Sequence, residues 1–508
     1  MANRSPLRTR RSTMTNTSQP HTLTSANPPL AGASHTVCAA RKPVAQVDRR
    51  RVELSPKLDP EQRRRLGQFM TPASVARYMA TLFDAYSAHV RLLDAGAGLG
   101  SLTAAFVEAA VSASAPPQSI DVTAFEIDPV LAAVLEVTLA SCAELCAASG
   151  IAFSSRIVEA DYIKTTMAAS GDYPAYNCAI LNPPYGKIPS RSEARGALDV
   201  LGVSASNFYT AFVSLALAQL APGGELVAIT PRSYCNGVMH RAFRSFLLGS
   251  AALTALHLYG SRSAVFDGEV LQEVVVMKLR KSAEQGTVLL SSDTAAPRAL
   301  PVTDIVGSNE QQQVIRFPLE TDNAARHVAG LPCTLADLGL QVSTGRVMEH
   351  RTRPHLRNEG ETGSVPLIHP QHLLHGAVRW PIEGFRKSNA LADIEETRAL
   401  SMPAGAYVLA KRITAKEEKR RVQASLYSGG RVAFENHVNV FHANGAGLSE
   451  PLARGLTLFL NSEEVDAYIR TVSGSTQINA TDLRLLRYPS VRHLVALGEG
   501  AVKMADIV

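Results

Sequence analysis

The feature that most constrains this chain is a regular alternation of short apolar runs and helical patterns between residues 90 and 279. A strand pattern begins each of five segments, which are 90–100, 121–129, 153–163, 177–185 and 225–231. Helices are expected from the end of the first segment to about residue 114, and over 129–147 and 205–221. Two further strand patterns follow at 252–260 and 273–279. Strands that alternate with helices form parallel-type sheets with helices on both faces. The sequence therefore predicts an α/β fold of this kind.

The fourth strand pattern ends in a distinctive turn, Asn182-Pro183-Pro184-Tyr185. Two consecutive prolines lack backbone N–H groups and fix φ, so they make a rigid exit from a sheet. Open α/β sheets place ligands at such carboxyl ends of strands. An Asn amide oxygen and a proline carbonyl held there can accept the hydrogens of an exocyclic amine, while an aromatic ring stacks on the base. The turn therefore indicates methylation of a base amine, on a base flipped out of its duplex.

The three preceding strand patterns also end in polar or glycine-bearing segments. Asp94 opens a loop with three glycines, where the backbone can approach a ligand closely, although many such loops are only tight turns. Glu126 can accept hydrogen bonds from ribose hydroxyl groups, or can belong with Asp128 to the start of the next helix. Asp161 can accept from an adenine amine, or can lie at the surface as an ordinary carboxylate. Three such ends in register favour a shared nucleotide-like ligand.

A helical pattern runs to Phe83 after Thr71-Pro72. Thr71 suits an N-cap position and Pro72 the first position of the helix. A well-capped amphipathic helix accounts for everything in this region except the Gln68-Phe69 pair that precedes it.

The first 51 residues hold nine Lys and Arg against one acidic residue, so the pI near 9.0 belongs to this segment rather than to the chain as a whole. The segment is rich in Ser, Thr, Pro and Arg and shows no hydrophobic period, which is typical of disorder. We expect the ordered chain to begin near Leu54. The six cysteines show no metal-ligand spacing, so they are expected to be buried reduced thiols, and no membrane segment is expected.

A basic segment stands out in the C-terminal third of the chain. Residues 411–421 hold six basic residues, which suit contacts with phosphates, although a solvated charged loop has the same composition. The residues predicted to make such contacts are Lys411, Arg412, Lys419, Arg420 and Arg421.

Taken together, these segments resemble the γ-class N6-adenine DNA methyltransferases of type II restriction–modification systems, and within them the PstI/BsuBI-like modification methylases. The resemblance covers roughly residues 60–490, and it rests on the order as much as on the content of the motifs. In order they read GQFMTP, LLDAGAGLGSL, AFEID, EADYI, LNPPY, AVFDGEVLQEVVVMKL, VSTGRV, YVLAKRITAKEEKRR, ENHVNVF and SGSTQINATDL.

The resemblance implies S-adenosyl-L-methionine (AdoMet) as the methyl donor and gives roles to individual residues. In the cofactor site, the resemblance implies that the methionine end of AdoMet is framed by Phe69, Thr71 and Pro72. The side of AdoMet that faces the protein backbone is lined by Asp94, Gly96 and Gly98. The ribose is held by Glu126, and the adenine is contacted by Ile127 and Asp161. In the target site, Asn182 and the Pro183 carbonyl accept from the amine, Tyr185 stacks on the base, and Phe266 contacts it.

The resemblance also implies an organisation and partners. The resemblance implies a Rossmann-like AdoMet-dependent methyltransferase sheet over 54–330 and a target-recognition domain that binds double-stranded DNA over 331–508. Residues 1–53 have no counterpart in the motifs of the family, and their composition predicts a disordered basic tail. A separately encoded restriction endonuclease is the expected partner, and the bacterial cytoplasm the expected location. Methyltransferases acting on RNA or on protein glutamine, and a catalytically inactive DNA-binding protein, remain as alternatives.

Overall fold

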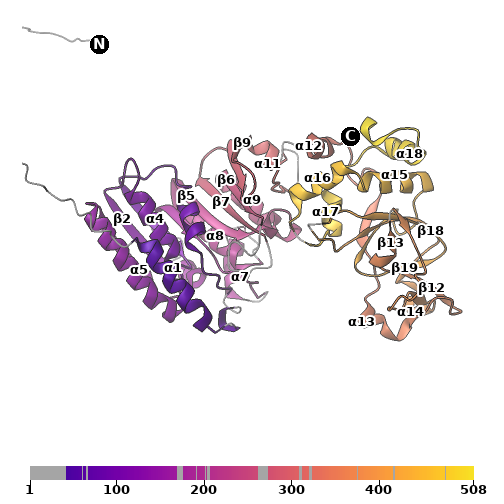
Figure 1. Ribbon diagram of the computed structural model, residues 1–508, viewed down its shortest axis with the longest axis horizontal. Coiled ribbons are helices and arrows are strands. Elements are labelled where there is room, and N and C mark those ends of the chain that lie inside the picture. Colours follow the sequence, from indigo (N-terminus) through magenta and orange to yellow (C-terminus); the bar gives the residue numbers. More distant parts are fainter. Residues whose placement is uncertain are drawn as a thin grey trace, which may run out of the picture. The chain divides into compact units, whose positions relative to one another are not determined.

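The computed structural model describes residues 42–507 except 60, 64–66, 169–174, 190–191, 201, 203–205, 261–272, 308–311, 320–322, 375, 416–417 and 475. Residues 41–508 form one compact unit (Figure 1). Within this unit, we call residues 43–319 the N-terminal part and residues 323–507 the C-terminal part.

The N-terminal part is built on one sheet, which has nine strands among the described residues. These are β1 (His89–Ala95), β2 (Ser119–Phe125), β3 (Ala152–Val158), β4 (Tyr176–Leu181), β5 (Leu220–Pro231), β6 (Ala251–Tyr259), β7 (Val274–Lys281), β8 (Thr287–Ser292) and β9 (Arg298–Pro301). The spatial order is β3-β2-β1-β4-β5-β7-β6-β8-β9. The first five strands run parallel, and β7 is antiparallel to β5 and β6.

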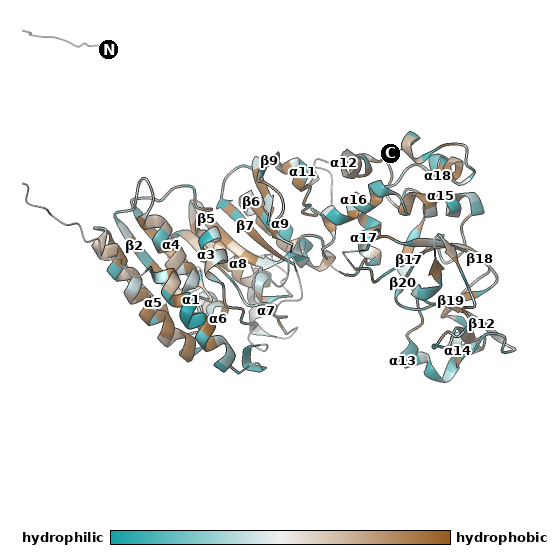
Figure 2. Ribbon diagram, in the orientation of Figure 1, coloured by the Kyte–Doolittle hydropathy of each residue, from teal (hydrophilic) through white to brown (hydrophobic). Residues whose placement is uncertain are grey.

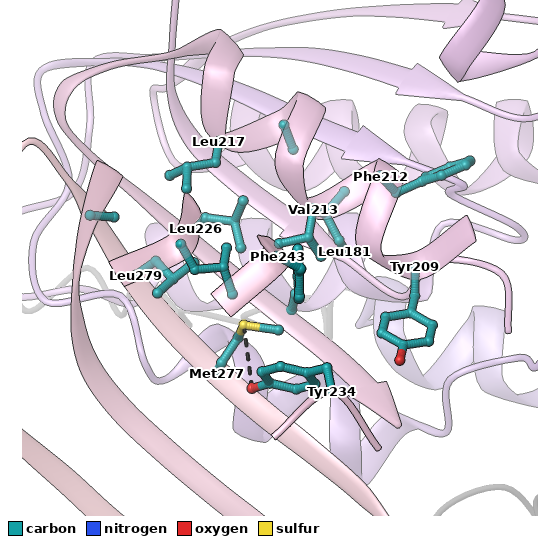
Figure 3. Packing of buried hydrophobic residues seen from close by; sticks show 14 of the residues in the cluster. Leu181, Tyr209, Phe212, Val213, Leu217, Leu226, Tyr234, Phe243, Met277 and Leu279 are labelled. Atoms are coloured by element: carbon teal, nitrogen blue, oxygen red, sulfur yellow. Dashed lines mark hydrogen bonds between the residues drawn. The ribbon is translucent and has the colours of Figure 1, made fainter. Parts of the chain in front are cut away.

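Helices cover both faces of this sheet, because its inner strands are apolar on both sides. They are α1 (Pro43–Leu54), α3 (Ala73–Ala80), α4 (Ser101–Val111), α5 (Pro129–Ala148), α6 (Tyr162–Ala168), α7 (Glu193–Val200), α8 (Phe208–Gln219), α9 (Arg241–Ser250) and α11 (Val302–Ile305). In β1, Leu92 packs in the core with α1, α3, α4 and α5, and Leu93 in the core with α8 and α9. Figure 2 shows the apolar character of the sheet and its covering helices, and Figure 3 the α8–α9 core. The predicted α/β fold is confirmed.

The strand order reverses between β1 and β4. The chain moves outward from β1 through β2 to β3, and then returns to the other side of β1 to form β4 and β5. Such a reversal leaves a crevice beyond the carboxyl ends of the two central strands, where open α/β sheets bind ligands. The glycine loop leaves β1 and Asn182 leaves β4 at this point.

The ordered chain begins earlier than the sequence predicted. The helix α1 was expected to belong to a disordered tail, but Val44 and Val47 are fully buried in the core that α1 forms with α4 and α5. The carboxylate of Asp48 also accepts a hydrogen bond from Ala73 N, the first residue of α3, at 3.2 Å. The expectation that residues 1–53 are disordered is therefore wrong for α1. This helix is mostly polar, so its two buried valines produce no clear hydrophobic pattern in the sequence.

The C-terminal part contains two further sheets. One has the order β10 (Gln341–Thr344), β20 (Val438–His442), β17 (Gly405–Lys411), β18 (Ala424–Gly429), β14 (Ala377–Val378) and β13 (Leu373–Leu374). The other has the order β11 (Leu356–Arg357), β15 (Ala390–Ala392), β12 (Ser364–Ile368), β19 (Val432–Phe434) and β16 (Ser401–Met402). Its helices are α12 (Asn323–Gly330), α13 (Glu349–Thr352), α14 (Glu395–Arg398), α15 (Glu450–Leu460), α16 (Glu463–Val472), α17 (Ala480–Leu485) and α18 (Val491–Gly498).

The boundary between the two parts was expected at residue 331, but the structure places it before α12, one helix earlier in the sequence. The helix α12 packs against α16, and Val328 is buried in the same core as Leu456 and Phe459. The C-terminal part therefore includes α12.

The helix α5 is long and apolar enough to cross a membrane by length and composition, a test that core helices of soluble folds also pass. Here one side of α5 packs into the sheet core through Leu135, Leu139 and two cysteines. Of the five described cysteines, all are free thiols; Cys142, Cys146, Cys178 and Cys235 are buried as predicted, whereas Cys333 is half-buried.

Candidate active site

A cavity of about 180 Å³ opens at the carboxyl edge of the sheet, where the strand order reverses. Its walls come from the ends of β1, β2, β3 and β4 and from the segment that precedes α3. Among the residues with a predicted role, it is lined by Phe69, Thr71, Gly96, Gly98, Glu126, Ile127, Asp161 and Asn182. The structure thus brings the ends of four strands together with the segment before α3, and it places Asn182 against Phe69, 113 positions earlier in the sequence.

Asn182 is held in one orientation by both hydrogens of its amide. Its Nδ2 donates to the Phe69 carbonyl at 2.6 Å and to Thr71 Oγ1 at 2.9 Å. A carbonyl can only accept, so the amide nitrogen must face Phe69 and the oxygen must face away. Among the described residues, no donor reaches the buried Asn182 Oδ1. The site therefore presents a fixed and unused hydrogen-bond acceptor.

Asn177, at the other end of β4, shows what an ordinary structural asparagine looks like in this sheet. Its Nδ2 also makes two hydrogen bonds, to Ser87 Oγ and to the His89 carbonyl. Its Oδ1 differs from that of Asn182, because it accepts from Arg91 N at 2.8 Å. The free oxygen of Asn182 is thus a feature of the carboxyl end of the strand.

The segment before α3 explains the Gln68-Phe69 pair that the helix alone left unexplained. Gly67 O accepts from Tyr185 N at 3.1 Å, so this segment lies along the Pro-Pro turn. Gly67 has φ +63°, and a Cβ there would lie 2.8 Å from Tyr185 N, so only glycine fits. Sequence reasoning missed Gly67.

Thr71 does not cap α3 as predicted. The N-cap position is Pro72, and the free N–H of Ala73 is instead satisfied by Asp48 from α1. Because the Asp48 carboxylate accepts from Ala73 N, the Thr71 hydroxyl is not needed for capping and instead accepts a hydrogen bond from Asn182. Pro72 itself is not among the cavity-lining residues.

Tyr185 lies beside the cavity rather than in its wall. Its ring centroid is 5.3 Å from that of Phe69, which does line the cavity. Its hydroxyl donates to the Ile229 carbonyl of β5 at 3.3 Å, and burial raises its pKa well above the usual value. The carbonyl of Pro183 accepts no hydrogen bond from the part of the chain that the structure describes. Asn182, Pro183 and Tyr185 thus lie in one turn beside the cavity, and their roles toward a target base stay a prediction.

Glu126 ties the glycine loop to the end of β2. Its Oε2 accepts from Gly98 N and its Oε1 from Asp128 N, both at 2.8 Å. Burial raises the pKa of this carboxyl, and the two N–H groups oppose the rise. The cap of α5 is Asp128, whose side chain accepts from Val130 N, so Glu126 is not the capping residue. Each Glu126 oxygen keeps a second lone pair for a ligand.

The remaining cavity wall is suited to a flat apolar group. Ile127 is 51% exposed and lines the cavity, which is unusual for a large aliphatic side chain beside a core. A Cβ on Gly98, which has φ +57°, would meet no atom within 4 Å, so the loop leaves open space there. Asp161 directly precedes α6, its Oδ1 accepts from Lys164 N at 3.1 Å, and it also lines the cavity.

Comparison with known proteins identifies the family. The chain is 44% identical over 468 residues to the type II methyltransferase M.PstI of Providencia stuartii, covering 88% of this chain and 92% of that protein. It is 37% identical over 486 residues to the type II methyltransferase M.BsuBI of Bacillus subtilis, covering 91% and 95%. The chain belongs to the type II methyltransferases. Residues 151–266 also match the Eco57I restriction-modification methylase family.

A solved structure shares the fold of this type II methyltransferase over most of its length. The DrdV–DNA complex aligns with a TM-score of 0.51 at 12% identity, covering 90% of this chain and 59% of that chain.

Asp94 has a different place from the predicted one. It is completely buried and is not among the residues that line the cavity of this methyltransferase. Thr103 Oγ1 in α4 donates to its Oδ2 at 2.6 Å, while its Oδ1 has no partner among the described residues. Burial raises its pKa to about 7. Asp94 therefore holds the end of β1 to α4, and the loop wall of the cavity is formed by residues 96–99, which include Gly96 and Gly98.

The cations of the basic segment differ in their surroundings. Arg421 is 1% exposed and donates from Nη1 to the Ser473 carbonyl at 3.4 Å. Arg420 bonds the Asn461 carbonyl and pairs with Glu463, while Arg412 donates to Asn479 Oδ1 at 3.3 Å. Lys419 is exposed and Lys411 is half-buried. The prediction of a phosphate contact is thus wrong for Arg421, because burial takes its guanidinium away from any outside partner.

Phe266, the remaining predicted site residue, lies outside the described residues.

Proposed function

We propose that this type II methyltransferase transfers a methyl group from AdoMet to N6 of an adenine that is flipped out of double-stranded DNA. The observation that carries the proposal is the Asn182 amide, which is fixed by two hydrogen bonds through its nitrogen and offers an unused buried oxygen. An acceptor fixed in advance needs no reorganisation when charge develops on the reacting group.

The cavity residues fit AdoMet as the cofactor. A buried carboxylate with spare lone pairs at the end of β2 suits two ribose hydroxyl groups, and the exposed Ile127 beside it suits the face of an adenine ring. Asp161 suits the exocyclic amine of that ring, and the open space at Gly98 lets the ligand lie against the backbone. When bound there, AdoMet supplies an electrophilic methyl group.

The target amine belongs on the side of the cavity formed by the Pro-Pro turn. Asn182 Oδ1 and the Pro183 carbonyl can each accept one N6 hydrogen, which draws the nitrogen lone pair out of conjugation with the ring. Tyr185 stacks on the base, and its hydroxyl bond to β5 keeps the ring in place. The chain thus orients the nucleophile, and none of these residues has to change its protonation state, because the proton that N6 loses on methylation passes to solvent.

The substrate is proposed to be DNA rather than RNA or protein glutamine. The two relatives named above are type II methyltransferases matched over most of their length, including the C-terminal part. An inactive DNA-binding protein does not need an asparagine oxygen kept free of partners. We further propose a separately encoded restriction endonuclease as partner, double-stranded DNA bound in part by the C-terminal part, and action in the bacterial cytoplasm.

The test is to incubate the purified protein with duplex DNA and methyl-labelled AdoMet and to digest the DNA to nucleosides for mass spectrometry. Label in N6-methyl-2′-deoxyadenosine alone is the expected result. Label in N4-methyl-2′-deoxycytidine would support methyl transfer to an exocyclic amine but refute adenine as the target base. Label in 5-methyl-2′-deoxycytidine, or no label, would refute the proposed function.

A further inference from the structure

Arg232 is a buried cation that joins the N-terminal part to the C-terminal part. It follows the last residue of β5 directly, it is 5% exposed, and its Nη1 pairs with Glu273 Oε2 at 2.8 Å. Glu273 directly precedes β7, and its carbonyl accepts from Arg232 N at 2.9 Å. One ion pair and one backbone hydrogen bond therefore join the C-terminal end of β5 to the N-terminal end of β7.

The other side of the Arg232 guanidinium faces the end of α16 in the C-terminal part. Its Nη2 donates to the Thr471 carbonyl at 2.8 Å and to the Arg470 carbonyl at 3.4 Å. The last carbonyls of a helix have no partner within the helix and carry partial negative charge, so a cation is well placed there. The guanidinium also lies 4.6 Å from the centre of the Phe317 ring.

Gly474 leaves no spare room at this junction. A Cβ on Gly474 would lie 1.5 Å from Glu273 Oε2 and 2.9 Å from Arg232 Cδ. Its φ lies outside the left-handed region, so close contact with the ion pair is the reason that a side chain does not fit. A second bond nearby, from Asn236 Nδ2 to Asp482 Oδ1 at 3.0 Å, joins the same two parts. We call Arg232, Glu273, Thr471 and Gly474 the Arg232 junction.

The Arg232 junction is linked to the proposed target site through β5. The Tyr185 hydroxyl bonds the carbonyl of Ile229, three residues before Arg232. Ser233, the residue after Arg232, bonds the hydroxyl of Tyr209, whose ring lies edge-on to Tyr185 at 6.5 Å. A displacement of Arg232 therefore moves two groups that hold the Tyr185 ring.

We propose that Arg232 and Glu273 are positioning residues for methyl transfer, which keep Tyr185 in register with the C-terminal part. The proposal rests on the proposed function, because it assigns the junction a role in that reaction. A buried ion pair is a weak source of stability but an exacting geometric constraint, since each charge must keep its partners. The junction thus fixes where the target base lies relative to the part of the chain that carries the basic segment.

The test uses two variants that leave both charges in place. Gly474→Ala places a methyl group where the ion pair lies and so forces the pair to shift. Arg232→Lys keeps the positive charge but removes the fork of N–H donors that contacts Glu273 and the carbonyls of α16 at the same time. Gly430→Ala is the matched control, because a Cβ there meets no atom within 4 Å. For each protein one measures the melting temperature, AdoMet binding without DNA, and the single-turnover rate of methylation at saturating DNA and AdoMet.

We expect Gly474→Ala and Arg232→Lys to methylate at least about tenfold more slowly, because small misplacements of a reacting group have costs of this size. AdoMet affinity should stay within about twofold of the wild-type value, since the cofactor cavity does not include the junction. Should Gly474→Ala fail to fold, Arg232→Lys alone decides the matter. A wild-type rate in Arg232→Lys, or a lower melting temperature with an unchanged rate, would overturn the proposal. Wild-type protein that methylates no DNA adenine would instead refute the proposed function.

Discussion

The helix α1 offers the sharpest test of where the folded chain begins. We predict that replacing both Val44 and Val47 with alanine lowers the free energy of unfolding by about 3–4 kcal/mol. Each substitution removes two buried methyl groups worth about 0.8 kcal/mol apiece and leaves a small cavity, which gives about 2 kcal/mol per site. The two sites lie one helical turn apart and share neighbours, so their effects should add incompletely.

Val52→Ala on the same helix is the matched control, because Val52 is 57% exposed and its loss should change stability by less than about 0.5 kcal/mol. The assay is urea denaturation followed by far-UV circular dichroism. The single tryptophan, Trp380, lies in the C-terminal part, so its fluorescence shows separately whether that part unfolds in the same transition. Equal stability of the double variant and the control would refute the assignment of α1 to the core. Deletion of residues 1–51, which the sequence alone suggests to be harmless, should destabilise the protein for the same reason.

Three further predictions follow from the site and its surroundings. Ile127→Ala should weaken AdoMet binding in calorimetry by about 1–2 kcal/mol, whereas Val130→Ala, equally exposed but outside the cavity wall, should not. Arg421→Ala should lower the free energy of unfolding by about 3 kcal/mol or more because its guanidinium is buried, whereas Lys419→Ala should only weaken DNA binding, most strongly at low salt. Burial raises the pKa of Asp94 from 3.8 to about 7, so between these pH values the folded state holds a proton that the unfolded state has released. The free energy of unfolding of the wild-type protein should therefore fall as the pH rises from about 4 to 7. In denaturation series over this range, Asp94→Asn should remove the part of the fall that comes from Asp94.

The sheet could be predicted from the sequence because its signals are local. The helix expected over 129–147 is Pro129–Ala148, and the strand expected before Asn182 ends at Leu181. Buried parallel strands are nearly continuous apolar runs, and glycine, proline and polar residues mark their ends. The same signals placed Glu126 and Asn182 at one edge of the sheet.

The rest depended on contacts between distant segments. Nothing local shows that Asp48 caps α3 from another helix, which frees Thr71 for Asn182. Arg421 reads as a solvent-exposed cation in a basic run, yet tertiary packing buries it. The C-terminal strands are two to seven residues long, too short for a clear period, so only the resemblance pointed to a separate domain there.

The most direct test of the account compares Asn182→Ala with Asn177→Ala. Both asparagines are anchored at the ends of β4 by two hydrogen bonds from the amide nitrogen, but only Asn182 keeps its oxygen free of partners among the described residues. The measurement is the single-turnover rate of adenine methylation, with AdoMet affinity determined on the same samples. Asn182→Ala should lose about 100- to 1000-fold in rate while still binding AdoMet, and Asn177→Ala should keep its rate. A wild-type rate in Asn182→Ala would contradict the account.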